Sequence, residues 1–456
     1  MRRVVKVSRI RIIITIIVVV LTTLLTGCTG KEPNEIAYVV ALGIDSTDDD
    51  NYKITIQYAN TTQISGGASE SGGKAGSEIV DNVTIEAPNI YAGVGLANNI
   101  VSKSFSMSHA KLIVFSKEIA EKGVKDMIET LVRSEEIRPD VFIAVANTTA
   151  NDYLTSVNPE MEVNPAQYYQ LIYQKNQLVG IPDGQLREFF TGLYTDNYDS
   201  ILPIAGVIEG SGGNSQNDDK GQSKDGQNEG SEGSSESLDS FESKSSNEKD
   251  ENEKEKNKKK NTSKYEYDIK NYIGGETAIE KKNKAEAIGA AVFEKDKMVG
   301  ELGEVETEIC KMLKGDYTYS YLTYYNNDTP DIPITVKTTQ QKKPKYKIDT
   351  DKKTVDIELY IESDLYSLPA DYNVENKIED FERDVANYTS SACTEFINNF
   401  TKKYNSDILK LNEKVKYKFL TNNQYNWFKK NVGWSEYKFS VCTNFKVRRT
   451  GLIVRE

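Results

Sequence analysis

The chain has 456 residues and a formal net charge of −12 at pH 7, with 57 Lys and Arg against 69 Asp and Glu. An acidic surface repels phosphate groups, so the composition argues against a nucleic-acid partner. The length allows two or three domains. One histidine and four cysteines leave little material for a metal site or a disulfide framework.

The first 28 residues have the pattern of a lipoprotein signal peptide. The segment before residue 12 carries five basic residues and no acidic one, and the almost wholly apolar stretch Ile12–Leu25 follows. This stretch is shorter than the roughly 20 residues that a membrane-spanning helix needs. Leu25-Thr26-Gly27-Cys28 resembles a lipobox, so we expect cleavage after residue 27 and a diacylglycerol and an N-acyl chain on Cys28. An uncleaved membrane anchor with an incidental cysteine is the alternative.

The expected anchor is the acylated N-terminus. Two acyl chains suffice for stable membrane attachment, whereas one is marginal. Because the mature chain is acidic, we expect these chains, rather than a basic patch, to hold the protein at the membrane.

Residues 28–150 are predicted to form an N-terminal α/β domain. Ile36–Ile44 is a continuous apolar run typical of a buried strand, and the alternation in Tyr52–Tyr58 predicts a half-buried strand antiparallel to it. The alternation of strands and helices that follows predicts a crossover between parallel strands. The expected strands are Lys111–Ser116 and Asp140–Ala146, and the expected helices are Pro88–Val101 and Lys117–Arg133.

Residues 151–281 are predicted to form a small middle domain that carries a disordered insertion. The insertion, residues 210–263, contains only two hydrophobic residues amid Gly, Ser, Asn, Glu, Asp and Lys. Such a segment cannot bury enough apolar surface to offset the entropy of ordering it. We interpret it as a solvated insertion, with a tether or a docking segment as the alternative.

Residues 282–456 are predicted to form a C-terminal α+β domain, an antiparallel sheet packed by a long helix. A short helix over Glu304–Leu313 is expected to end at Gly315. The later elements are a strand with one wet face over Val355–Ile361, a long helix over Val374–Lys403 and a final strand over Tyr437–Val447. The predicted fold class of the whole chain is therefore α+β with about three domains.

Three cysteines remain after Cys28, an odd and widely spaced set that does not describe a disulfide framework. Cys310 and Cys393 fall on apolar helical stripes, so we expect buried thiols. Cys442 alternates onto the polar face of a strand, so we expect it to be exposed.

A search of the sequence for catalytic groups returns no nucleophile–base pair, metal cluster or cofactor loop. Asp45 follows the first strand and is interpreted as a turn former, with an active-site carboxylate as the alternative. His109 lacks triad partners in its neighbourhood and is interpreted as a hydrogen-bonded structural residue. The glycine-rich stretch Gly66–Gly76 does not have the spacing of a phosphate-binding loop.

Two further groups of residues have structural interpretations. Four glutamates crowd the start of the predicted short helix and are expected to complement its dipole: Glu301, Glu304, Glu306 and Glu308. Trp427 and Trp434 lie near lysines; we favour core packing, with an aromatic and basic surface for a partner or a membrane as the alternative. The sequence thus predicts no enzyme, no cofactor and no metal.

Short motifs over nearly the whole mature chain share the order and spacing of one protein family. Besides the lipobox, the stretches concerned are Glu35–Ala37, Ala41–Asp45, Ser106–Phe115, Glu118–Gly123, Leu131–Arg133, Glu135–Arg138, Gly289–Leu302, Glu306-Thr307 and Asp407–Leu409. Together they resemble the C-subunits of spore germinant receptors, the Ger(x)C lipoproteins. The insertion 210–263 and the loop Gly66–Gly76 depart from that pattern.

The resemblance implies a non-catalytic α+β lipoprotein of three domains on the outer face of the spore inner membrane. It implies assembly with integral membrane A-type and B-type subunits into a receptor for nutrient germinants that triggers spore germination. The subunit would act as a scaffold or coupling component, with the lipid on Cys28 as its only attached group. The alternative is a solute-binding lipoprotein of a membrane transporter, a class that usually has two similar lobes.

Overall fold

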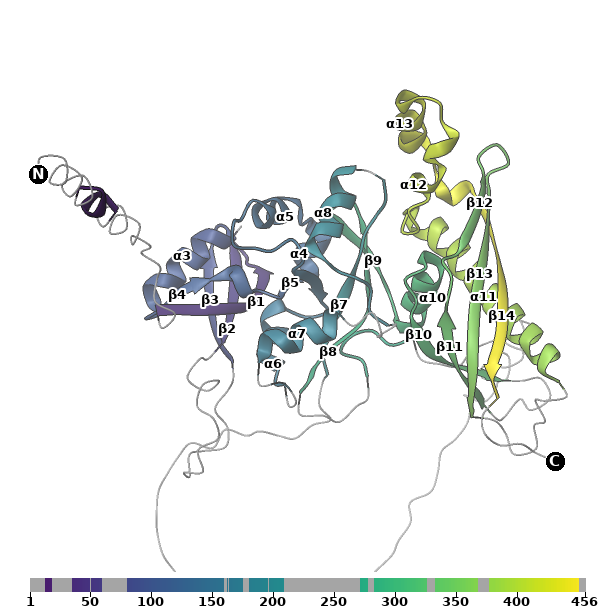
Figure 1. Cartoon of the computed structure of the whole chain (residues 1–456), viewed down its shortest axis with the longest axis horizontal. Helices are drawn as coiled ribbons and strands as arrows, with labels where there is room; N and C mark the ends of the chain where they lie inside the picture. Colours follow the sequence, from purple (N-terminus) through teal and green to yellow (C-terminus); the bar gives the residue numbers. More distant parts are fainter. Residues whose placement is uncertain are drawn as a thin grey trace, which may run out of the picture. The chain divides into compact units, whose positions relative to one another are not determined.

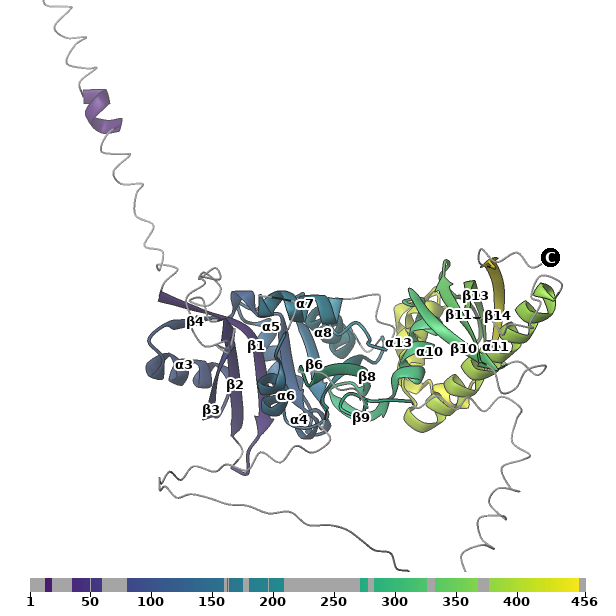
Figure 2. The same cartoon turned by 90° about the horizontal axis from the view of Figure 1, so that it is seen from below.

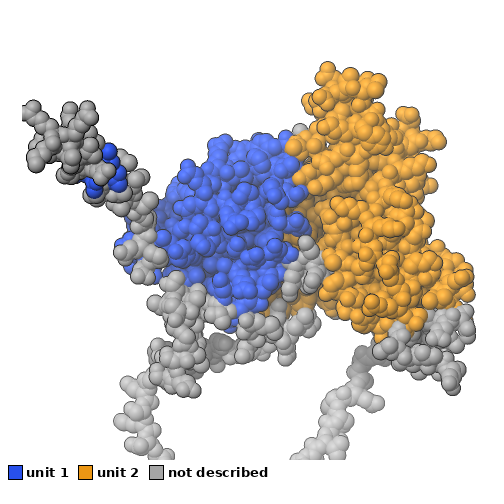
Figure 3. Space-filling view, in the orientation of Figure 1, with its two compact units in different colours: residues 1–175, 183–194, 295–298 blue, residues 176–182, 195–294, 299–456 orange. Residues whose placement is uncertain are grey.

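The structure is a computed structural model that divides into two compact units (Figure 3). Unit 1 comprises Met1–Lys175, Asp183–Tyr194 and Lys295–Met298, and unit 2 comprises Asn176–Pro182, Thr195–Glu294 and Val299–Glu456. The residues that the structure describes are 13–18, 35–49, 51–59, 80–159, 162, 164–174, 180–195, 197–208, 271–277, 283–325, 333–367 and 377–450.

Several predictions fall outside the described residues. These are the signal segment apart from residues 13–18, the lipid-attachment residue Cys28, the loop Gly66–Gly76 and the insertion 210–263. The partition into domains at 28–150, 151–281 and 282–456 also stays a prediction. Among the helices that the structure does describe, none has both the length and the apolar character needed to cross a bilayer.

Unit 1 is built on a sheet in the order β3-β2-β1-β5-β6, with β4 also paired to β1 (Figure 1). The antiparallel part and the parallel part meet at β1, because β2 is antiparallel to β1 whereas β4 and β5 are parallel to it. β5 and β6 are buried along their whole length. The strands are β1 (Ile36–Ser46), β2 (Tyr52–Ala59), β3 (Val80–Ala87), β4 (Ser104–Ser106), β5 (Leu112–Ser116) and β6 (Phe142–Ala146).

The helices of this unit pack against the sheet, and one predicted helix is in fact two. Gly123, at φ 125°, ends α4 (Lys117–Lys122), and α5 (Lys125–Val132) begins after a buried Val124. The prediction of one helix over Lys117–Arg133 is therefore wrong, since the apolar spacing continues across a glycine that turns the backbone. The other helices are α3 (Ile90–Ile100), α6 (Ala150–Ser156), α7 (Pro165–Gln174) and α8 (Leu186–Thr195).

Unit 2 begins with three neighbouring strands, β7 (Ile201–Val207), β8 (Ala285–Glu294) and β9 (Lys297–Leu302). β7 and β8 are antiparallel. The helix α10 (Glu304–Lys314) packs on β8 and ends at Gly315, whose left-handed backbone confirms the predicted stop.

The second sheet of unit 2 confirms an antiparallel sheet packed by a long helix (Figures 1 and 2). Its antiparallel strands follow the order β10-β11-β13-β12, and the last strand, β14, joins β13 in parallel. The parallel pairing was not predicted, because alternation along a strand carries no information about its direction. The strands are β10 (Tyr319–Tyr325), β11 (Pro333–Gln340), β12 (Lys345–Asp349), β13 (Thr354–Ser367) and β14 (Lys438–Arg449).

The long helix α11 (Ile378–Tyr404) covers this sheet with an apolar face that includes Phe381, Val385 and Phe396. Cys310 and Cys393 are buried in the same region and Cys442 is exposed, as their periodicities predict. After α11 the chain forms α12 (Leu411–Val415), η4 (Lys416–Lys418), α13 (Asn422–Asn431) and η5 (Trp434–Glu436) before it enters β14.

Polar side chains of α11 also cover the outer edge of β14. Ser390 Oγ accepts from Thr443 N at 2.9 Å, and Thr394 Oγ1 accepts from Val441 N at 3.0 Å. Four residues of a helix rise about 6 Å, and two residues of a strand rise about 6.6 Å. Because these distances are similar, a polar residue at every fourth position of α11 lies beside every second residue of β14.

Asn398 completes this edge by binding both polar groups of one backbone residue. Its Oδ1 accepts from Phe439 N at 3.1 Å, and its Nδ2 donates to Phe439 O at 3.0 Å. An edge strand that is paired in this way cannot recruit a strand from another chain.

We expect Asn398→Ala to lower the free energy of unfolding by about 1–3 kcal/mol, because it leaves buried backbone groups of Phe439 without partners. Denaturant unfolding of the full chain measures the change. Asn399→Ala, at the exposed next position of α11, is the matched control and should change stability much less. Equal effects of the two substitutions would contradict a role for the edge contacts.

Candidate functional site

The carboxyl ends of the parallel strands β1, β5 and β6 meet at one edge of the sheet in unit 1. In α/β sheets, ligands commonly bind at such an edge. Asp45 and Ser46 end β1, Ser116 ends β5, and Glu118 lies in the first turn of α4. This edge is therefore where unit 1 would place a catalytic or binding centre.

Asp45 lies within β1 and is buried, and its carboxylate binds the start of α6. Oδ1 accepts from Ala150 N at 2.6 Å, and Oδ2 accepts from Asn151 N at 3.0 Å. Burial raises the pKa of Asp45, while these two backbone hydrogen bonds oppose the increase. The interpretation as a local turn former is incomplete, because the carboxylate holds a helix that begins about a hundred residues later.

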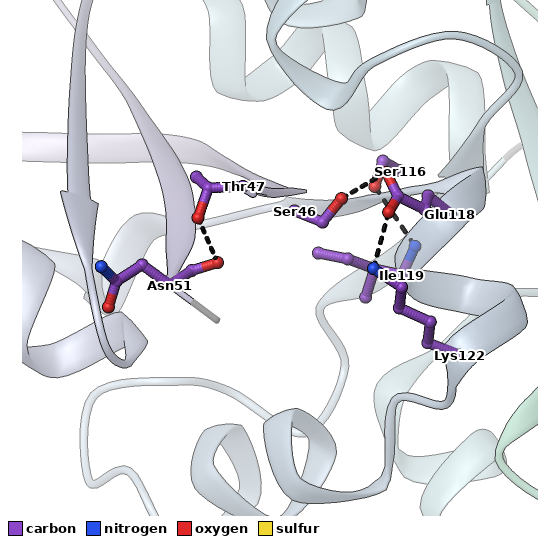
Figure 4. Close-up of polar contacts among 7 residues, drawn as sticks. All are labelled: Ser46, Thr47, Asn51, Ser116, Glu118, Ile119 and Lys122. Carbon is purple, nitrogen blue, oxygen red and sulfur yellow. Dashed lines mark hydrogen bonds and ion pairs between the residues drawn. The ribbon is translucent and has the colours of Figure 1, made fainter. Parts of the chain in front are cut away.

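The neighbouring polar groups at this edge are also engaged with each other (Figure 4). Ser116 Oγ accepts from Ile119 N at 3.4 Å and caps α4. Glu118 accepts from Ser46 Oγ and from Lys122 Nζ, the latter at 2.6 Å, and the hydrogen bond from Lys122 lowers its pKa. These contacts tie the end of β1 to the first turn of α4.

His109 is exposed on the short helix η2 (Met107–His109) of unit 1. Its Nδ1 lies 3.0 Å from Ser108 Oγ, and its ring packs edge-on against Tyr38 at 4.7 Å between centroids. These contacts agree with the interpretation as a hydrogen-bonded structural residue. No group of three His, Cys, Asp or Glu residues in the described parts of the chain could hold a metal ion.

Two of the four glutamates that were predicted to complement the dipole of α10 lie at its start. Glu304 and Glu306 lie in the first turn, and Glu306 accepts from Gly303 N at 3.0 Å and from Asn271 Nδ2 at 2.9 Å. Glu301 instead lies on β9. Glu308 lies further along the helix, where burial raises its pKa.

The two tryptophans have opposite environments. Trp434 is 2% exposed and donates from Nε1 to Asn412 Oδ1 at 3.2 Å, which confirms core packing. Trp427 on α13 is 69% exposed, so the same prediction is wrong there. Sequence could not separate them, because both lie among lysines and aromatic residues.

Asp407 is a buried carboxylate whose structural role was not recognised from sequence. Its Oδ1 accepts from Leu411 N at 2.7 Å and its Oδ2 from Asn412 N at 2.8 Å, at the start of α12. Its own N donates to Asp199 Oδ2 at 2.9 Å. Burial raises the pKa of Asp407 to about 7. A turn with Lys410 at φ 57° separates Asp407 from the helix, so no local capping pattern marks it.

A groove between α10 and α11 in unit 2 has a volume of about 310 Å³. This volume is at the lower end of the range for small-molecule pockets. Aromatic, aliphatic, polar and charged side chains line it: Leu302, Glu306, Ile309, Ala392, Glu395, Phe396, Asn399, Phe400, Lys403 and Tyr404.

Comparison with protein families decides what kind of protein carries these features. The model described as the N-terminal domain of spore germination proteins matches residues 30–207. The model described as the spore germination B3/GerAC-like C-terminal domain matches residues 288–451. The chain belongs to this family of spore germination proteins. The interval between the two matches contains the insertion 210–263.

Curated relatives match over shorter stretches. Spore germination protein KC of Bacillus subtilis (strain 168) is 26% identical over 174 residues, which are 35% of this chain and 42% of that protein. Spore germination protein B3 of the same organism is 26% identical over 148 residues, 30% of this chain and 36% of that protein. The matched regions thus span less than half the length of these relatives.

A solved structure, the crystal structure of the GerBC protein, aligns with 89% of this chain and 96% of its own. The identity is 15% and the TM-score is 0.47.

The raised pKa of Asp407 predicts how the stability of this protein depends on pH. Between about pH 4 and pH 7 the folded protein keeps a proton on Asp407 that the unfolded chain has lost, so this residue makes stability fall as pH rises. Asp407→Asn cannot titrate. We therefore expect the stability deficit of the variant relative to wild type to shrink from about pH 4 to about pH 7, measured by urea unfolding.

Asp351→Asn, at an exposed position on the turn between β12 and β13, is the control and should keep the wild-type pH profile. A deficit of Asp407→Asn that grows toward pH 7 would mean that the two backbone hydrogen bonds outweigh burial and keep Asp407 ionised.

Proposed function

We propose that this protein is the lipid-anchored, non-catalytic C-subunit of a germinant receptor complex that triggers spore germination in response to nutrients. The observation that carries the proposal is the pair of family matches, which take in both sheets of the fold. The names of the relatives, spore germination proteins KC and B3, support a role in germination.

The N-terminal sequence supports attachment to the membrane through Cys28. The basic segment, the short apolar stretch and the Leu25–Cys28 motif together favour an acylated N-terminus. In this proposal the folded part lies on the extracytoplasmic face of the spore inner membrane. Its partners are the integral membrane A-type and B-type subunits of the receptor, and it binds no nucleic acid.

The use of the polar groups in unit 1 supports a scaffold or coupling role. Asp45 binds the start of α6, Ser116 caps α4, and Glu118 is paired with Ser46 and Lys122. Acceptors for backbone N–H groups at helix starts have a structural role. The proposed subunit therefore acts through folded surfaces and requires no cofactor.

We expect Cys28→Ala to leave the protein lost from, or only weakly held at, washed spore membranes, because it lacks the acylated residue. Immunoblotting of membrane fractions measures the change, and affinity purification tests whether integral receptor subunits still co-purify. Cys442→Ala, which removes the exposed thiol on β14, is the matched control and should behave like wild type. Wild-type levels of the Cys28→Ala protein in membranes would place the anchor elsewhere.

The non-catalytic role predicts opposite effects for two neighbouring substitutions in unit 1. His109→Gln keeps a polar side chain at an exposed position and should preserve germination at normal protein abundance. Val114→Asp places a carboxylate at a fully buried position of β5 and should cost several kcal/mol and lower abundance.

Germination assays paired with immunoblots of spore membranes distinguish the two effects. Loss of germination in abundant, membrane-assembled His109→Gln protein, together with tolerance of Val114→Asp, would mean that chemistry at His109 is required.

A further inference from the structure

The segment from η4 to α13 exposes three large apolar side chains to solvent. Tyr417 is 80% exposed, Leu420 is 95% exposed and Trp427 is 69% exposed. Single exposed apolar residues are common, whereas here three of them fall within eleven residues of sequence. We call residues 416–431 the terminal lobe.

Other aromatic side chains, rather than these three, pack together to stabilise the terminal lobe. Phe419 lies 4.9 Å from Phe428 and Phe428 lies 6.1 Å from Trp434, measured between ring centroids. Lys429 Nζ also holds α13 by donating to Thr195 O and Asn197 Oδ1, both at 3.0 Å. The exposed residues are therefore not needed for the fold of the lobe.

The terminal lobe is positively charged, in contrast to the acidic chain as a whole. Residues 416–431 contain four lysines and no acidic residue, whereas the whole chain carries a formal charge of −12. Lys430 lies three residues after Trp427 on α13, on the same helix face, and both are exposed. Lys416 is exposed beside Tyr417.

Exposed Trp and Tyr beside Lys are the residues that proteins place at the interface between a bilayer and water. In Figures 1 and 3, α13 lies at the end of unit 2 and projects from the body of that unit at the top of the view. A projecting site can approach a flat surface without obstruction from the rest of its own unit.

We infer that the terminal lobe binds the surface of an anionic bilayer, with Trp427, Leu420 and Tyr417 among the lipid headgroups and Lys416 and Lys430 beside phosphate groups. The inference rests on the proposed anchoring at Cys28, because it concerns a second contact with the same membrane. Only seven residues separate Cys28 from Ile36, so the eight backbone steps span at most about 28 Å, and an acylated chain would keep β1 of unit 1 close to the bilayer.

Quenching of tryptophan fluorescence by brominated lipids tests this contact, because the chain has two tryptophans and only Trp427 is exposed. The acylated full chain is reconstituted in phosphatidylcholine vesicles with and without phosphatidylglycerol, each prepared with brominated acyl chains. We expect quenching in the anionic vesicles, and its loss in Trp427→Phe. We also expect it to fall at about 1 M salt, where the Debye length is about 3 Å.

Charge variants separate a specific contact from a general effect of net charge. Lys416→Glu combined with Lys430→Glu should abolish the quenching. Lys297→Glu combined with Lys342→Glu makes the same change in charge at exposed positions outside the lobe and should retain it. Thermal unfolding that matches wild type shows that each variant is folded.

The outcomes for the lobe and for the anchor are distinguishable. Flotation of wild-type protein and of Cys28→Ala with the vesicles reports the anchor. Wild-type protein that floats while Trp427 stays unquenched would overturn the lipid contact, leave the anchor in place and favour a protein partner for the lobe. Quenching that is equal with and without phosphatidylglycerol would overturn the preference for anionic lipid.

Discussion

Buried backbone N–H groups need hydrogen-bond partners, and this constraint organises both units of the protein. An unpaired buried N–H costs about as much as a lost hydrogen bond, so each helix start and strand edge in the interior requires an acceptor. Here the acceptors are side chains that lie elsewhere along the chain. Asp45 serves the start of α6, Asp407 serves the start of α12, and Ser390 and Thr394 serve the edge of β14.

This constraint accounts for the hydrogen bonds of two buried carboxylates, Asp45 and Glu286. Asp45 lies at the strand edge where α/β proteins often bind ligands, yet both of its oxygens accept from backbone N–H groups. Glu286 is another buried carboxylate used in the same way, since it accepts from Gly275 N and Thr277 N.

Two surfaces of unit 2 differ in whether they are available for contacts with other molecules. The edge strand β14 is covered by α11 and is closed to strand pairing. The terminal lobe, by contrast, has a closed aromatic interior and an open face of Tyr417, Leu420 and Trp427.

The sequence by itself determined the elements with strong periodicity, such as β1, β5 and the long helix α11, and it determined the burial of Cys310 and Cys393, because these follow from local patterns. Motif order also indicated the family. The tertiary structure alone decided the break at Gly123, the parallel pairing of β14 with β13, the opposite environments of Trp427 and Trp434, and the partners of Asp45 and Asp407. Each depends on groups far apart in the chain, or on a backbone turn, that hydrophobic periodicity does not encode.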